Sequence, residues 1–184
     1  MSFSLGNSSL SAMPRASLST LRSSLMRDLG AGFATVLQEA GYAGGETILA
    51  GMREWCAANG LGSPETLAYA QFQQVAARFF AETGWGNVTL EPIGDTAIAI
   101  DAPDWAESDP AAQMPYPGCY YTVGILADVF GRVADGPLQC LEVECRSAGS
   151  GRCRFLLASP EVIAHVYQRI TEGVGYQSAL TELA

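Results

Sequence analysis

The stretch that decides the fold is residues 118–155, which read GCYYTVGILADVFGRVADGPLQCLEVECRSAGSGRCRF. It contains four of the five cysteines and two nearby carboxylates: Cys119, Cys140, Cys145, Cys153, Glu142 and Glu144. Zinc accepts sulfur, nitrogen and oxygen ligands in a tetrahedral shell, so thiolates and a carboxylate around a Gly-rich turn are typical of such a site. The pattern therefore indicates a metal site.

The secondary structure of this stretch decides which side chains can meet. The apolar spacing predicts a helix over residues 118–133 with Cys119 in its first turn, followed by a hairpin of strands at 138–146 and 152–158. Alternation along the first strand places Glu142 and Glu144 on one face and Cys145 on the other. Glu142 and Cys145 can then reach one ion only if the strand bulges or ends before Cys145.

The cysteines also allow a simpler interpretation, because free cysteine is among the most buried residue types and packs as a small apolar side chain. The spacing alone leaves this alternative open. No CxxC pair is present, which argues against a ferredoxin-type iron–sulfur cluster.

Three arginines bracket the proposed site: Arg146, Arg152 and Arg154. Three thiolates and a carboxylate carry more negative charge than one zinc ion neutralises. We therefore expect at least one of these guanidinium groups to donate to a thiolate or to the glutamate. The alternative is that they line a solvated hairpin edge.

The rest of the chain predicts an α+β fold in a single domain, with an antiparallel sheet of two hairpins packed against several helices. Helical spacing starts at Leu21, is expected to break at Gly41 and Gly44–Gly45, and resumes from about residue 46 to 59. A third helix is expected from Ser63 to about residue 84, and a first hairpin at 87–91 and 97–100. A helix from residue 159 and a short one from 176 complete the chain. Residues 1–20 are Ser-rich and are expected to form a flexible tail before a domain at 21–184.

The composition excludes several classes of function. A net charge of −9 makes nucleic acid an unlikely partner, and the absence of lysine excludes Schiff-base chemistry and a Walker-type phosphate loop. The odd cysteine count, with no evident signal peptide, favours a reducing compartment, the cytoplasm. No uncharged run is suited to span a bilayer. The apolar fraction of 48% makes a homo-oligomer plausible.

Three short runs carry a family resemblance: GCYYTVGILA at 118–127, EVEC at 142–145 and, after Gly149 and Gly151, CRF at 153–155. They resemble the 4-vinyl reductase domain family. The resemblance implies a fold similar to the transport-particle subunits of vesicle tethering, and relatives among sensor domains of aromatic-responsive regulators and proteins of bacteriochlorophyll synthesis. It also implies a zinc ligand set of Cys119, Glu142, Cys145 and Cys153. Under this set Cys140 becomes a pocket wall and Cys56 a core residue.

The function expected from this resemblance is a zinc-containing module that binds or senses a small hydrophobic or aromatic ligand, and that forms a homodimer as related folds do. The alternatives are an accessory or carrier protein for a tetrapyrrole of bacteriochlorophyll synthesis, and an assembly subunit. We expect no catalysis, since no nicotinamide fingerprint or catalytic triad is recognisable. Helix face, strand parity and an aromatic loop suggest four ligand contacts, for which core packing is the alternative: Val123, Cys140, Ile98 and Trp105.

Two departures from the sensor branch affect the choice of ligand. We expect no ATPase or DNA-binding region, so direct activation of transcription is not expected. The sole histidine, His165, falls on the last long helix and is expected at the surface or an interface. Phenol is therefore a doubtful ligand.

Overall fold

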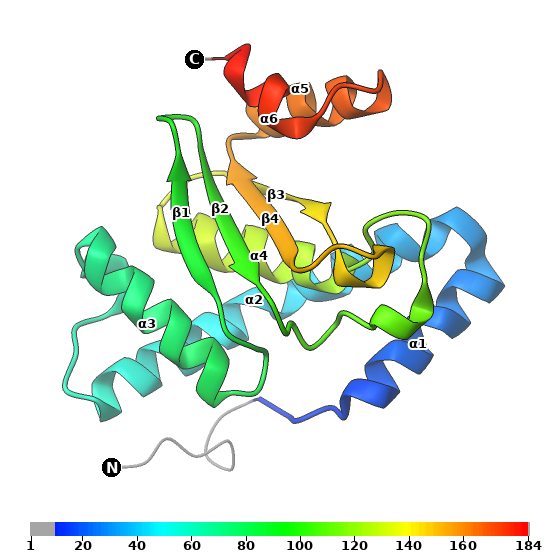
Figure 1. Cartoon of the computed structure of the whole chain (residues 1–184). Helices are drawn as coiled ribbons and strands as arrows, with labels where there is room; N and C mark the ends of the chain where they lie inside the picture. The colour runs from blue at the N-terminus through cyan, green and yellow to red at the C-terminus, as the bar shows by residue number, and fades with distance from the viewer. Residues whose placement is uncertain (1–9, 184) are drawn as a thin grey trace.

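The computed structural model describes residues 10–183 and contains one four-stranded antiparallel sheet with the strand order β1-β2-β4-β3 (Figure 1). The strands are β1 (Thr89–Ile93), β2 (Ala97–Ala102), β3 (Gln139–Glu144) and β4 (Cys153–Ala158). Both predicted hairpins are present, and β2 joins them by pairing with β4, with Ile100 opposite Phe155. The predicted fold class is confirmed.

Helices cover both faces of this sheet (Figure 1). The helices are α1 (Arg15–Leu29), α2 (Phe33–Ala58), α3 (Tyr69–Glu82), α4 (Tyr120–Val133), α5 (Pro160–Thr171) and α6 (Tyr176–Thr181). On one face α3 and α4 meet the sheet and α2 packs against α4, while α5 and α6 cover the other face. Alternate β4 residues serve the two faces: Phe155 and Leu157 join the larger core, and Leu156 joins the smaller one.

The predicted helix break at Gly41 and Gly44–Gly45 is wrong, because α2 runs unbroken from Phe33 to Ala58. These glycines serve helix packing instead. A Cβ atom on Gly41 would lie 2.0 Å from the Tyr121 carbonyl oxygen, and one on Gly124 would lie 2.0 Å from the Gln38 carbonyl oxygen. The backbones of α2 and α4 therefore touch directly, and α4 is buried along most of its length.

Two predicted boundaries differ from the structure. Helix α1 begins at Arg15, directly after Pro14, so part of the predicted tail at residues 1–20 is helical, while residues 1–9 lie outside the described residues. The third helix begins at Tyr69 because Pro64 starts a short 3-10 turn, Pro64–Thr66, after which Leu67 is extended. Among the helices of residues 10–183, none has the length and hydropathy needed to cross a bilayer.

Candidate metal centre

Four side chains that are distant in sequence meet at one buried point between α4 and the β3–β4 hairpin. Cys119 directly precedes α4, Glu142 lies on β3, Cys145 follows β3 and Cys153 begins β4. Their donor atoms all lie within 4.8 Å of one another. The structure thus brings together the four residues that the resemblance implied as ligands.

The spacing of the sulfur atoms fits a tetrahedral ion. The Sγ atoms of Cys119 and Cys145 are 3.8 Å apart, and both cysteines are free thiols. A tetrahedral shell with metal–sulfur distances of about 2.3 Å has an edge of about 3.8 Å. The two sulfur atoms therefore stand at the separation that a shared zinc ion requires.

A β-bulge solves the parity problem of the first strand. The register of β3 against β4 shifts between Glu142, which faces Phe155, and Glu144, which faces Arg154, and the strand ends just before Cys145. Glu142 therefore points into the larger core beside Cys145. The expectation that Glu142 and Glu144 share a face is wrong, because the extra residue sends Glu144 to the opposite side.

Glu142 has an oxygen that a cation would satisfy. Its Oε2 accepts a hydrogen bond of 2.7 Å from the backbone N–H of Cys119. Its Oε1 is buried and has no hydrogen-bond partner among the described residues. A buried polar atom without a partner costs about 1–3 kcal/mol, and more when it is charged. This orphan oxygen belongs to the same buried group as the three thiols, so the donor set fits a metal ion.

The electrostatics of the cluster point the same way. Burial, and next the charge of Cys145, raise the pKa of Glu142 well above its usual value. Hydrogen bonds with Cys145 and Cys153, together with burial, raise the pKa of Cys119. Glu142 and Cys119 therefore hold their protons when no cation is bound. A divalent ion would bring four ionised ligands from a charge of about −4 to about −2.

Backbone amides, rather than the predicted arginines, support the cluster. The amides of Gly118 and Arg146 bond to the sulfur atoms of Cys145 and Cys153, respectively. The guanidinium groups of Arg152 and Arg154 instead pair with carboxylates away from the thiols. Arg152 pairs with Glu144 and Asp101, and Arg154 pairs with Asp101.

The side chain of Arg146 also turns away from the cluster. Its Nη1 donates to Ser108 Oγ at 3.3 Å. The expectation that an arginine side chain donates to a thiolate or to Glu142 is therefore not met by any of the three, since alternation along β4 and the turn direct them elsewhere.

One buried carboxylate that the sequence analysis missed, Glu107, lies next to the site. Only 1% of Glu107 is exposed, and its carboxylate accepts from the N–H groups of Tyr121 and Thr122 at 3.1 and 2.7 Å and from Thr122 Oγ1 at 2.6 Å. Burial raises the pKa of Glu107 to about 7, against the opposing effect of these hydrogen bonds. Its position in a Pro-rich loop gave no helical or strand pattern to reveal it.

The four predicted ligand contacts lie in the core beside the metal cluster. Val123, Cys140 and Trp105 are buried, and Ile98 packs against the same group of side chains. Trp105 Nε1 donates to Thr122 Oγ1 at 2.6 Å, so its N–H group is already bonded. A role for these residues in ligand binding stays a prediction.

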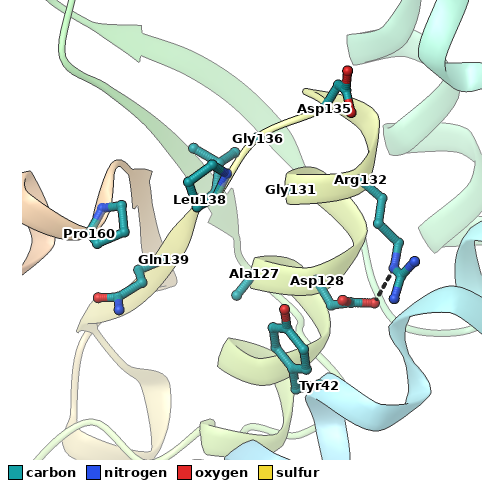
Figure 2. A pocket seen from close by; sticks show the side chains of 11 residues that line it. Tyr42, Ala127, Asp128, Gly131, Arg132, Asp135, Gly136, Leu138, Gln139 and Pro160 are labelled. Carbon is teal, nitrogen blue, oxygen red and sulfur yellow. Dashed lines mark hydrogen bonds and ion pairs between the residues drawn. The ribbon is translucent and has the colours of Figure 1, made fainter.

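Two surface pockets lie elsewhere. One, of about 500 Å³, is at the C-terminal end of α4, where the Asp128–Arg132 ion pair faces Gln139 and Pro160 across the opening (Figure 2). The other, of about 640 Å³, lies between the β1–β2 turn and α6 and includes Arg154. Neither is lined by the four predicted ligand contacts.

The remaining singled-out residues lie away from the cluster. Cys56 is fully buried in α2, as expected of a core residue. His165 is on α5, partly exposed, with its Nε2 atom 3.1 Å from Glu182 Oε2. It therefore contacts the C-terminal segment and not the metal cluster.

Comparison with known proteins supports the family resemblance. The family model of the vinyl-4-reductase domain matches residues 104–158, a segment that contains all four clustered donors, and the resemblance to the 4-vinyl reductase domain family is confirmed. No curated protein matches the chain. Solved structures similar to this chain share its fold at low sequence identity.

Three of these structures span the branches that the resemblance named. The phenol-responsive sensory domain of the transcription activator PoxR with phenol has a TM-score of 0.66 at 16% identity, covering 83% of this chain and 77% of that one. A vinyl-4-reductase family protein from Methanocaldococcus jannaschii has a TM-score of 0.52 at 18% identity, covering 81% and 83%. A trafficking protein particle complex subunit 3 from Naegleria fowleri, covalently bound to palmitic acid, has a TM-score of 0.55 at 15% identity, covering 78% and 91%.

Proposed function

We propose that this protein is a small-molecule binding module of the vinyl-4-reductase domain type, with a structural zinc ion held by Cys119, Glu142, Cys145 and Cys153. One observation carries the metal proposal: the buried oxygen Oε1 of Glu142, without a partner among the described residues, lies with three buried thiols that form no disulfide. Thiolate-rich ligand sets favour zinc over magnesium or calcium.

The ion would be structural because the protein supplies four ligands and leaves no open position for water or substrate. When bound, it would supply electrostatic cross-linking of the four donors. The donors come from the start of α4 and from both strands of the second hairpin, so binding would fix α4 on the sheet. Metal binding and folding would then be coupled.

The ligand proposed for this module is small and hydrophobic or aromatic. The aromatic character of the core beside the cluster supports it: the ring of Trp105 lies 5.5 Å from Phe80 and 6.1 Å from Phe155. The sensory function of the structurally similar PoxR domain, whose structure contains phenol, is consistent with it. A ligand would contact Val123, Cys140, Ile98 and Trp105, and would have to separate side chains that pack together here.

We also propose that the protein forms a homodimer. Apolar side chains on α1 and at the start of α2 face solvent: Leu21 is 42% exposed, Leu29 49% and Val36 42%. Exposed apolar side chains gathered on neighbouring elements in this way are a feature of protein–protein contact surfaces.

Native mass spectrometry of the purified protein, before and after chelation, tests these proposals together. The expected spectrum has one zinc per chain, a subunit number of two and a small additional mass that is lost on denaturation. A coloured macrocycle as the additional mass would favour the tetrapyrrole carrier, the alternative function. A chain without metal, whose spectrum is unchanged by chelation, would refute the zinc site.

A further inference from the structure

The first turn of α4 lacks the cap that its own sequence would provide. Cys119 occupies the N-cap position but makes no side-chain capping bond, since its thiol faces the other donors. The first N–H groups of a helix have no partner within the helix. Here two buried carboxylates accept them: Glu142 accepts from Cys119, and Glu107 accepts from Tyr121 and Thr122.

Glu107 is well suited to fix this turn. Both of its carboxylate oxygens are used, one by the N–H of Tyr121 and the other by the N–H and hydroxyl of Thr122. A negative charge at the N-terminus of a helix is also favoured by the helix dipole. Trp105, two residues earlier in the loop, donates to the same hydroxyl of Thr122. The loop thus holds α4 through two side chains that converge on one residue.

Helix α1 holds the loop that carries Glu107. Three side chains on α1, at spacings of four and three residues, bond to it. Arg15 donates to the Asp104 carbonyl at 2.9 Å, Ser19 to the Asp109 carboxylate at 2.7 Å and Arg22 to the Glu107 carbonyl at 2.8 Å. Arg22 is only 2% exposed, and its charge acts on the Glu107 carboxylate.

The same loop is bonded to the turn that carries Cys145. The backbone N–H of Asp109 donates to Ser147 Oγ at 2.8 Å, and the N–H of Met114 donates to the Ser147 carbonyl at 2.7 Å. Ser147 lies two residues after Cys145 and is fully buried. The loop is therefore fastened both to α4 and to the hairpin, the two elements that supply the donors.

We propose that Glu107 is the positioning residue of the metal centre, fixing the first turn of α4 so that the Cys119 thiolate faces Glu142, Cys145 and Cys153. This inference rests on the proposed metal site. Glu107 is not itself a ligand, because its oxygens are engaged by three donors from α4. It acts through Cys119, and Arg22 on α1 holds Glu107 in turn.

The test is the Co²⁺ affinity of Glu107→Gln, measured under mildly alkaline conditions by competition with a chelator and read from the thiolate-to-cobalt absorption bands. Glutamine keeps the shape but turns an NH₂ group toward at least one donor. Partners that hold a metal ligand in place typically contribute about 10- to 100-fold to affinity, and we expect a loss of that size. We also expect altered cobalt bands, which a purely structural role would leave unchanged.

Asp128→Asn is the matched control. Asp128 is another buried carboxylate on α4, near its C-terminal end, and pairs with Arg132 at 2.7 Å. We expect this variant to lose stability but to bind Co²⁺ with the affinity and spectrum of the wild type.

The outcomes separate the two proposals. If the wild type forms no thiolate–cobalt bands, the metal site itself is refuted. If the wild type binds Co²⁺ and Glu107→Gln binds it equally well with the same bands, the positioning role alone is refuted. Should Glu107→Gln fail to fold, Thr122→Val, which removes only the hydroxyl bond to Glu107, is expected to reduce affinity about 2- to 10-fold. Unchanged affinity in Thr122→Val would then overturn the inference.

Discussion

The contact between α2 and α4 predicts opposite effects for one substitution at two positions of the same helix. A Cβ at Gly41 would lie 2.0 Å from the Tyr121 carbonyl oxygen and 3.1 Å from the Ile125 amide nitrogen. A Cβ at Gly44 would lie 3.8 Å from the Tyr121 hydroxyl, an ordinary contact. Both changes to alanine gain about 1 kcal/mol of helix propensity.

Only Gly41→Ala must also move backbone. Its Cβ has to retreat by about 1 Å to reach an acceptable distance, and such overpacking costs about 1–3 kcal/mol or more. Gly44→Ala should therefore be more stable than the wild type by up to about 1 kcal/mol, and Gly41→Ala less stable than Gly44→Ala by about 1–3 kcal/mol. For a chain of this length that difference corresponds to roughly 2–12 °C in melting temperature.

Thermal unfolding of both variants and the wild type, followed by circular dichroism in excess zinc, measures this difference. Equal melting temperatures for Gly41→Ala and Gly44→Ala would refute the direct backbone contact. Tyr121 lies two residues after Cys119, so a weaker metal affinity in Gly41→Ala alone is expected as well.

Three further predictions concern the metal centre and the far face of the sheet. Cys145→Ser should lose the metal together with much of its thermal stability, because structural sites contribute binding energy on the order of 10 kcal/mol to folding, whereas Cys140→Ser should keep the metal; atomic absorption and thermal melts test both. Because the raised pKa of Glu142 leaves it protonated without a cation, binding should release protons and grow stronger as pH rises, which calorimetry in buffers of different ionisation enthalpy would detect; buffer-independent heats would contradict it. Tyr176→Phe removes the bond of 2.6 Å from the hydroxyl to Glu144 and should lower the free energy of unfolding by about 1–2 kcal/mol without changing metal content; an unchanged chemical denaturation curve would contradict this.

Much of the fold was predictable because local patterns carried it. The two hairpins follow from short apolar runs between turns, and the amphipathic spacing found the helices. The glycines of α2 misled the analysis because a glycine pair breaks an isolated helix, whereas here Gly41 is required by the approach of α4. That requirement depends on a helix much later in the chain, which no local pattern contains.

The four donors were predictable for a different reason. Their residue types and spacing follow the resemblance, and the need for a bulge or strand end before Cys145 follows from alternation along the strand. The charge argument for Arg152 and Arg154 failed because proximity in sequence does not decide the face of a strand. Glu107 was missed because its role depends on how a long loop folds back on α4.

X-ray absorption at the zinc edge of the protein as purified tests the central claim most directly, since it reports the ligand atoms around the ion. If Cys119, Glu142, Cys145 and Cys153 bind one zinc ion, the spectrum should fit three sulfur atoms at about 2.3 Å and one oxygen at about 2.0–2.2 Å. A shell of oxygen and nitrogen atoms only, or protein purified without metal that takes up none when zinc is added, would contradict the account.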